Sequence, residues 1–189
     1  IDPGLTKHVI DLIESLRMDG VNTNGISHVI NTHSHPDHFQ ASAYFQEVGA
    51  KVAMHKDEVE FLAGSGSELY SLFGISPPDT KIDLILEEGE LRFGESVLQI
   101  IHTPGHSPGS IAIYWEEKKA LFCGDTIFDQ NIGRTDFSGG NANEIKESIK
   151  KLSLLDVEHL FAGHMGMISE KDNVKKNFQV IIKSILPYI

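Results

Sequence analysis

Apolar residues recur along the chain with two spacings, one typical of helices and the other of short strands. Between positions 5 and 17 an apolar residue recurs every three or four positions, which predicts an amphipathic helix with one apolar face. Further helices are predicted at residues 39–48, 144–155 and 170–186. Short apolar runs bounded by turn residues predict strands at residues 28–31, 51–54, 82–86, 91–93, 97–101, 110–115, 120–122 and 159–161.

The five predicted strands between residues 82 and 122 follow one another closely, with glycine-containing turns between them, and this predicts a meander. Helices flank these strands in the sequence, so the pattern suits an α/β arrangement. There are no internal repeats and no low-complexity linkers. A length of 189 residues fits one domain of ordinary size, and residues 1–189 are therefore predicted to form a single domain.

The segment at residues 57–79 has a pattern of its own. A flexible Gly64-Ser65-Gly66-Ser67 stretch and a terminating Pro77-Pro78 pair accompany a set of large apolar residues: Phe61, Leu62, Leu69, Tyr70, Leu72 and Phe73. One interpretation is a helical insertion buried against the core. The other is a lid or dimer surface lining a substrate pocket, because loops on a rigid scaffold often determine specificity. The sequence is compatible with both interpretations.

The chain is acidic, with 16 Lys and Arg against 27 Asp and Glu and a formal net charge of −11. Binding to a nucleic-acid backbone needs a basic face, so this balance argues against nucleic acid as the main partner. No apolar run approaches the roughly 20 residues needed to span a bilayer, so no membrane segment is predicted. Hydrophobic residues make up 40% and charged residues 23%, as is ordinary for a soluble protein.

Cys123 is the single cysteine, which excludes an internal disulfide framework and predicts a reducing, cytoplasmic location. It lies two residues before Asp125, on the same face of a predicted strand, but its apolar neighbours favour a buried structural thiol over a metal ligand. The chain does not begin with Met, so a signal peptide removed ahead of Ile1 is compatible with these observations.

The stretch His33-Ser34-His35-Pro36-Asp37-His38 places four metal-ligand side chains within six residues. In an extended segment alternate side chains share a face, so His33 and His35 can bind one ion. Pro36 is favoured at the first position of a helix, and a turn there would direct Asp37 and His38 towards a second ion close by. Imidazole and carboxylate groups are ligands of zinc, iron and manganese. A histidine-rich solvated loop is the alternative.

Three candidate ligands downstream each follow an apolar predicted strand. His106 lies in a turn with two prolines and two glycines, which can hold a side chain rigidly at the end of a sheet. Asp125 ends the run Ala120-Leu121-Phe122-Cys123-Gly124, where an unpaired buried charge would be costly and a cation would remove that cost. His164 follows Leu160-Phe161-Ala162-Gly163 in the same way. Together these positions predict a metal site.

The seven positions together resemble the metallo-β-lactamase superfamily, whose motif is HxHxDH followed by a lone His, a lone Asp and a lone His. The match covers every motif position and runs from the first residues to about His164. The resemblance implies a two-metal ligand set: His33, His35 and His106 on one ion, Asp37, His38 and His164 on the other, and Asp125 bridging both.

The resemblance also implies a four-layer αββα sandwich, the metallo-β-lactamase fold. One departure concerns the beginning of the chain. Ile1-Asp2-Pro3-Gly4 resembles the Asp-x-Gly end of an early strand, and family members usually have a few more strands ahead of it. The N-terminal strands are therefore expected to be missing or shortened, together with an active-site loop that these strands often provide.

The implied cofactors are two divalent metal ions, zinc first, with iron or manganese as the alternatives. Two adjacent ions permit hydrolysis, because a bridging water has its pKa lowered to near neutrality and hydroxide becomes available as the nucleophile. Asp37 is predicted to orient that hydroxide while it holds one ion, and is therefore the catalytic residue among the ligands. One ion would polarise the substrate carbonyl and the other would hold the leaving group.

The substrate class is predicted from the stretches Gly124-Asp125-Thr126-Ile127-Phe128 and Gly133-Arg134-Thr135-Asp136-Phe137, which resemble the glyoxalase II branch of hydroxyacyl-glutathione thioesterases. A leaving thiolate is a stable anion near pH 8.5, so no dedicated general acid is required. Arg134 either binds a substrate carboxylate or forms an ion pair with Asp136. Only residues 165–189 follow His164, so the chain resembles compact glyoxalase II-like hydrolases, whose small-molecule substrates need not carry glutathione.

Two other functions stay open. A mononuclear iron oxygenase resembling the persulfide dioxygenases would use His33, His106 and Asp125 around one iron. Lactonases and β-lactamases of the same superfamily are further hydrolases that the motif suits. A binding protein with a vestigial site is disfavoured, because all seven ligand positions carry ligand residues.

Overall fold

The computed structural model describes residues 1–189, and the chain forms two compact units, Ile1–Leu86 and Glu87–Ile189. Both units combine helices and strands, which confirms the predicted α/β class. The prediction that residues 1–189 form one domain stays a prediction. None of the helices combines the length and the apolar composition that crossing a membrane requires.

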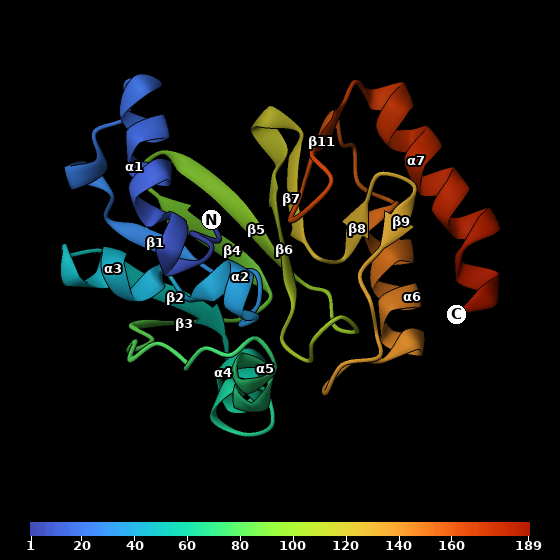
Figure 1. Cartoon of the computed structure of the whole chain (residues 1–189). Coiled ribbons are helices and arrows are strands. Elements are labelled where there is room, and N and C mark those ends of the chain that lie inside the picture. Colours follow the sequence, from blue (N-terminus) through green and yellow to red (C-terminus); the bar gives the residue numbers. More distant parts are fainter. The chain divides into compact units, whose positions relative to one another are not determined.

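The first unit contains a parallel three-stranded sheet in the order β1-β2-β3 (Figure 1). Its strands are β1 (His28–Ile30), β2 (Lys51–His55) and β3 (Leu84–Leu86). Parallel strands need long crossover connections, and helices provide them here. The helical elements are η1 (Thr6–His8), α1 (Val9–Met18), η2 (Thr23–Gly25), α2 (Pro36–Phe39), α3 (Ser42–Glu47), α4 (Lys56–Ala63) and α5 (Ser67–Leu72).

Two apolar clusters form the core of this unit. One joins α1, α3 and β1 through buried residues that include Val9, Ile13, Val29 and Phe45. The other joins α5 and β2 to the end of α2 through Phe39, Val52, Met54 and Tyr70. The predicted apolar face of the first helix is therefore the face that packs against α3 and β1. Every residue of β2 after Lys51 is buried, as in a parallel strand covered on both faces.

The first unit differs from the sequence prediction in two places. Residues 82–86 are predicted to open the meander, but β3 pairs in parallel with β2, because the crossover through α4 and α5 is long enough for a parallel return. The helix predicted at 39–48 is two helices, and the first begins at Pro36. The segment at 57–79 forms α4 and α5, in which Phe61 and Tyr70 are buried, and this agrees with the interpretation of a helical insertion packed against the core. Phe73, which follows α5, is 57% exposed.

The second unit contains a six-stranded sheet in the order β11-β10-β7-β6-β5-β4 and a small β8-β9 hairpin. Strands β4 to β7 form the predicted antiparallel meander, and β10 adds to it in parallel with β7. Strands β8, β9 and β11 are not among the predicted strands. The strands are β4 (Gly89–Phe93), β5 (Ser96–His102), β6 (Ile111–Trp115), β7 (Ala120–Gly124), β8 (Ile127–Phe128), β9 (Asn131–Ile132), β10 (His159–Ala162) and β11 (Met167–Ser169).

Two amphipathic helices, α6 (Ala142–Leu152) and α7 (Lys171–Ser184), pack against this sheet (Figure 1). Their buried positions recur every three or four residues, as the sequence predicts. The cluster includes Ile145, Ile149 and Leu152 of α6, Phe178 and Ile181 of α7, and Leu121, Cys123 and Leu160 of the sheet. Cys123 is fully buried and is a structural thiol, as its apolar neighbours predict. Short 3-10 helices, η3 (Glu116–Lys118) and η4 (Leu186–Tyr188), complete the unit.

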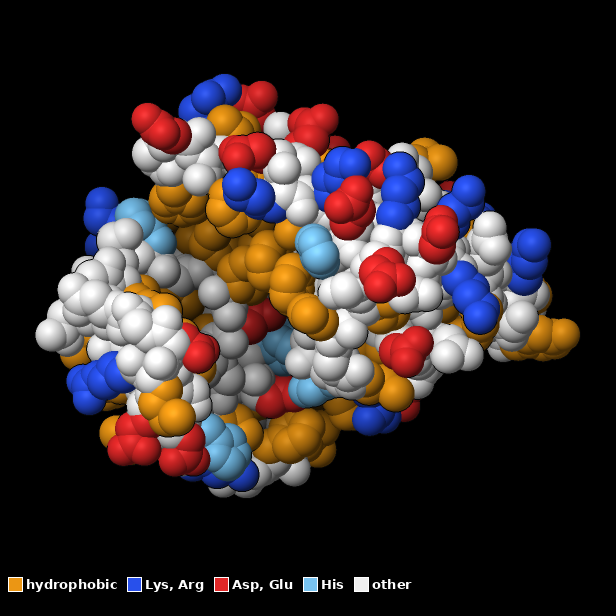
Figure 2. All heavy atoms as spheres, turned by 90° about the horizontal axis from the view of Figure 1, so that it is seen from above, with side chains coloured by type: hydrophobic (Ala, Val, Ile, Leu, Met, Phe, Trp, Pro, Cys, Tyr) orange, Lys and Arg blue, Asp and Glu red, His pale blue; other side chains and the backbone are white.

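The outer surface of α7 carries charges of both signs. Lys171 forms an ion pair with Asp156, and Lys175 and Lys176 are exposed on the same helix. Figure 2 shows basic and acidic side chains intermingled over the right-hand part of the view. On this face the lysines are therefore part of a mixed, solvated surface.

Candidate metal centre

The first unit brings three histidines of the HxHxDH stretch together directly after β1. The imidazoles of His33, His35 and His38 are buried. The His33 ring centroid lies 4.6 Å from that of His35 and 4.1 Å from that of His38. Pro36 ends the extended segment and begins α2, as predicted, so that His38 turns back beside His33 within one helical turn. Packing of this kind is costly for cationic rings and suits neutral, metal-binding imidazoles.

Asp2 orients this cluster. Its Oδ2 accepts a hydrogen bond from His38 Nδ1 at 3.0 Å, and its two oxygens also accept from the Thr32 backbone N–H and hydroxyl at 2.7 and 2.6 Å. With Nδ1 protonated and engaged, His38 presents Nε2 as its ligand atom. Asp2 lies close enough to His33 and His38 to count as a possible ligand itself, but its hydrogen bonds make it the orienting group. The sequence assigns Asp2 no such role.

Asp37 is the exposed member of the stretch. Its side chain is 41% exposed, and its Oδ2 lies 3.8 Å from Nε2 of His38. Two ligands that each lie roughly 2.0–2.2 Å from a metal can be at most about 4.4 Å apart, and this pair lies within that limit. The pair therefore fits one divalent cation that remains accessible to a substrate.

Glu58 and Tyr70 hold the backbone between the first two histidines. The buried Glu58 Oε1 accepts from the Ser34 N–H at 2.8 Å and from the Ser34 hydroxyl at 2.7 Å. The Tyr70 hydroxyl donates to the Ser34 carbonyl at 2.8 Å. Burial, together with the charges of Glu58 and Asp37, raises the pKa of Tyr70, so the hydroxyl keeps its proton. Residues 57–79 thus support the motif, which neither interpretation of that segment anticipates.

Replacing Glu58 with alanine is expected to lower the free energy of unfolding by about 2–4 kcal/mol, because two buried donors of Ser34 lose their acceptor. Urea unfolding of the metal-free protein measures the loss. Glu60→Ala is the matched control, since Glu60 lies two residues further along the same helix and is exposed. It should change the stability by less than about 0.5 kcal/mol. Equal losses in the two variants would contradict the role given to Glu58.

The second unit brings together His106, Asp125 and His164. Asp125 Oδ2 lies 3.6 Å from His106 Nε2 and 3.5 Å from His164 Nε2. Tetrahedral ligands about 2.1 Å from a zinc ion are about 3.4 Å apart, so the carboxylate stands at ligand-to-ligand distance from both imidazoles. The three groups therefore fit the task of holding divalent cations, with Asp125 between the histidines.

The sheet explains this convergence. Strands β7 and β10 run in parallel, with Ala162 opposite Gly124, so their carboxyl ends meet at one edge. Asp125 follows β7 directly, and His164 follows β10 after Gly163, whose N–H donates to the Gly124 carbonyl at 2.8 Å. Strand β5 is antiparallel to β6, as β6 is to β7, so β5 ends at the same edge and its following turn carries His106.

The carbonyl of Arg134 orients His106. His106 Nδ1 donates to this oxygen at 2.8 Å, which leaves Nε2 directed towards Asp125. The guanidinium of Arg134 donates to both oxygens of Asp136 at 2.7 Å and lies 3.6 Å from the centre of the Phe137 ring. This pairing lowers the pKa of Asp136. The sequence predicts two roles for Arg134, and the structure shows the ion pair with Asp136. Binding of a substrate carboxylate by Arg134 stays a prediction.

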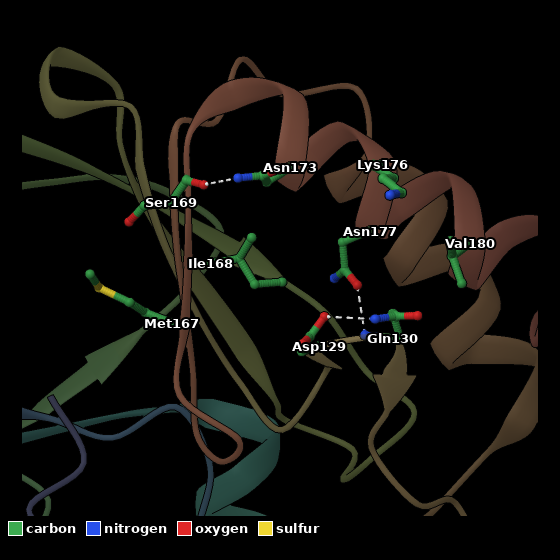
Figure 3. A pocket seen from close by; sticks show the side chains of 9 residues that line it. All are labelled: Asp129, Gln130, Met167, Ile168, Ser169, Asn173, Lys176, Asn177 and Val180. Carbon is green, nitrogen blue, oxygen red and sulfur yellow. Dashed lines mark hydrogen bonds between the residues drawn. The ribbon is translucent and has the colours of Figure 1, made fainter.

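The β8-β9 hairpin follows Asp125 and is attached to α7 by Asn177. The Asn177 amide accepts from the Gln130 N–H at 2.7 Å and donates to the Phe128 carbonyl at 2.9 Å. Figure 3 shows Asn177 pointing from α7 towards this turn, beside a cavity of about 340 Å³. The Phe128 ring centroid in turn lies 5.9 Å from that of His164. Asn177 therefore links the last helix to the surroundings of a ligand.

Replacing Asn177 with leucine, which has the same branching and number of side-chain heavy atoms but no hydrogen-bonding groups, is expected to lower the free energy of unfolding by about 2–4 kcal/mol. The buried Phe128 carbonyl and the partly buried Gln130 N–H of the hairpin lose their partners in this variant. The matched control is Asn173→Ala, because Asn173 is exposed on the same helix and donates to the Ser169 carbonyl, outside the hairpin (Figure 3). Thermal unfolding of both variants is the measurement. A similar shift for the two would contradict the anchoring role of Asn177.

Other histidines have local partners. His55 caps the start of α4, with its Nδ1 accepting from the Asp57 N–H at 3.3 Å. His102 Nε2 donates to the Pro108 carbonyl at 2.8 Å and so closes the turn that presents His106. His8 is exposed.

Comparison with known proteins identifies relatives. The family model described as "Metallo-beta-lactamase superfamily" matches residues 1–164. The chain is 33% identical to a hydroxyacylglutathione hydrolase of Rhodospirillum rubrum, over 87% of this chain and 56% of that protein. It is 36% identical to a probable metallo-hydrolase of Methanocaldococcus jannaschii, over 90% of this chain and 84% of that protein. The chain thus spans little more than half the length of the first relative and most of the second.

A solved structure shows the same fold. The crystal structure of the B3 metallo-beta-lactamase BLEG-1 superposes with a TM-score of 0.78 at 31% identity, covering 93% of this chain and 83% of that one. This likeness confirms the predicted fold.

Proposed function

Because this chain belongs to the metallo-beta-lactamase superfamily and resembles its metallo-hydrolases, we propose that it hydrolyses small-molecule thioesters with two divalent metal ions. The observation that carries the proposal is the Asp125 carboxylate, which stands at ligand-to-ligand distance from two imidazoles. The relative named hydroxyacylglutathione hydrolase supports the choice of a thioester. Because the chain spans 56% of that relative, glutathione as the thiol that carries the acyl group is a proposal for this chain.

The proposed ligand assignment follows the family motif residue by residue. The orienting hydrogen bonds of His38 and His106 support it, because each bond leaves Nε2 as the ligand atom. The assignment is His33, His35 and His106 on one ion, Asp37, His38 and His164 on the other, and Asp125 on both.

The two ions, when bound, supply a hydroxide nucleophile near neutral pH and stabilise negative charge on the attacked carbonyl. Asp37, the exposed ligand, orients the nucleophile and can accept its hydrogen bond. Asp2 and the Arg134 carbonyl fix the tautomer and the orientation of the two imidazoles, which preserves the ligand geometry through the reaction. The leaving thiolate needs no proton from the protein, since thiols ionise near pH 8.5.

A β-lactamase activity is the second candidate, and the 31% identity to a B3 metallo-beta-lactamase favours it over other superfamily reactions. The two candidates differ in the leaving group. A β-lactam releases an amine, which is a much poorer leaving group than a thiolate and needs a proton from an acid. The motif residues provide no acid beyond the metal ligands, and this favours the thioester.

The test compares hydrolysis of lactoylglutathione, a short acyl thioester of a simple thiol, and a chromogenic cephalosporin by zinc-loaded protein. Thioester turnover that exceeds cephalosporin turnover, with two metal ions per chain by elemental analysis, is the expected result. Cephalosporin turnover alone would replace the thioester with a β-lactam. One iron per chain with oxygen consumption on a persulfide substrate would overturn the hydrolase and favour the oxygenase alternative.

A further inference from the structure

A cavity of about 320 Å³ lies in the first unit, with Asp37 as part of its wall. We infer that it binds the apolar acyl group of the substrate, and this inference rests on the proposed hydrolysis of thioesters. Its apolar lining residues are Leu5, Pro36, Phe73 and Ile75. The volume lies in the range of pockets for small molecules.

The walls of this cavity are fixed to the elements that carry the ligands. The Gly4 N–H donates to the His38 carbonyl at 3.1 Å, and the Gly4 carbonyl accepts from the Ala41 N–H at 2.8 Å. The Thr6 N–H donates to Gln40 Oε1 at 3.2 Å. The loop at residues 4–6 is therefore hydrogen-bonded to the C-terminal end of α2, the helix of Asp37 and His38, and to the two residues that follow this helix.

The opposite wall is attached to the motif as well. The Ile75 N–H donates to the Tyr70 carbonyl at 3.1 Å, while the Tyr70 hydroxyl donates to the Ser34 carbonyl at 2.8 Å. Phe73, at the end of α5, is 57% exposed although the rest of the helix contributes Leu69 and Tyr70 to the core. An exposed aromatic residue beside other apolar walls indicates a surface that an apolar ligand covers.

The chemistry of the cavity walls and the position of Asp37 indicate which part of the substrate occupies the cavity. A group in this cavity lies beside a proposed metal ligand, so it belongs to the part of the substrate next to the reacting carbonyl. Glutathione carries two carboxylates and an ammonium group, which suit apolar walls poorly. Among the polar lining residues, Thr6 and Lys7 are exposed and Gln40 is engaged with Thr6. The acyl side of a thioester is therefore the group that fits.

The test uses straight-chain carboxylates from acetate to octanoate, which carry the acyl group of the hydrolysis product. Their dissociation constants for the zinc-loaded protein are measured by titration calorimetry, which needs no turnover. For the wild type we expect affinity to rise about fourfold for each methylene group that enters the cavity. Phe73→Ala is expected to weaken octanoate binding about tenfold and to leave acetate binding unchanged, because only the longer chain reaches this wall.

Two variants serve as controls. Leu72→Ala removes a neighbouring side chain that is 73% exposed and does not line the cavity, and it should bind every carboxylate like the wild type. Phe73→Leu keeps an apolar wall and should restore most of the affinity for octanoate. Affinity that does not depend on chain length, or equal losses for Phe73→Ala and Leu72→Ala, would overturn the inference. If thioesters are hydrolysed but affinity does not depend on chain length, the proposed function is retained and the acyl-binding role of the cavity is rejected. If affinity rises with chain length but thioesters are not hydrolysed, only the thioester is rejected as the substrate.

Discussion

Replacing Asp125 with alanine is expected to reduce kcat/KM for thioester hydrolysis by about a thousandfold or more. The carboxylate stands at ligand-to-ligand distance from both His106 and His164, so its loss removes a proposed ligand from both ions. Loss of a group that only orients a ligand costs roughly 10- to 100-fold, and loss of a shared ligand should cost more. Steady-state kinetics and the number of metal ions per chain are the two measurements.

The matched control is Asp129→Ala, because Asp129 lies four residues later in the chain and is exposed in the turn of the β8-β9 hairpin. This variant should bind metal and turn over substrate like the wild type. Full activity of Asp125→Ala with two retained ions would exclude a bridging carboxylate. Retention of one tightly bound ion with residual activity would instead indicate that Asp125 serves a single metal.

Replacing Gly133 with alanine is expected to lower the free energy of unfolding by about 3 kcal/mol or more, because the new methyl group has no room. A Cβ on Gly133 would lie 1.7 Å from the Asp125 carbonyl oxygen and 3.1 Å from His106 Nδ1. Backbone oxygen cannot move aside as a flexible side chain can, so the strand around Gly133 has to shift. The next residue supplies the carbonyl that orients His106, and metal affinity should therefore fall as well.

Chelator competition for zinc and thermal unfolding of the metal-free protein separate the two effects of Gly133→Ala. Gly64→Ala is the control, since a Cβ there meets only ordinary contacts, the nearest at 3.6 Å from the Glu60 carbonyl oxygen. It should shift stability by less than about 1 kcal/mol. Wild-type stability and zinc affinity in Gly133→Ala would contradict the close approach of this residue to Asp125.

The predictions that hold best concern strongly patterned segments. The apolar face of residues 5–17 is the face of α1 that packs, and Pro36 begins a helix as its fixed backbone angle favours. The parallel pairing of β3 with β2 could not be predicted, because an apolar run does not indicate which strand it will pair with. The break between α2 and α3 escapes it as well, since helix boundaries depend on tertiary contacts such as the hydrogen bond from the Ala41 N–H to the Gly4 carbonyl.

The side chains that orient the candidate ligands could not be predicted from the sequence either. Glu58 and Asn177 lie in stretches without a motif, and the Asp-x-Gly stretch that contains Asp2 assigns it no role at the site. Each of the three acts through hydrogen bonds to residues far away in the chain. Asp2 precedes His38 by 36 residues, and Asn177 follows Gln130 by 47. A buried polar residue in an otherwise apolar helix face was the one available indication, and Asn177 beside Phe178 provides it.

The sequence by itself determined the chemical type, number and spacing of the candidate ligands, because imidazoles and carboxylates at the ends of apolar strands suit few tasks other than binding metal. It also determined the helices whose periodic faces bury apolar surface. Only the tertiary structure decided that β7 and β10 run side by side, which brings Asp125 to His164, and that Asp2 and the Arg134 carbonyl select the ligand nitrogens. The physical reason is that strand pairing and hydrogen bonding join residues distant in the chain, whereas hydrophobic periodicity is a local property.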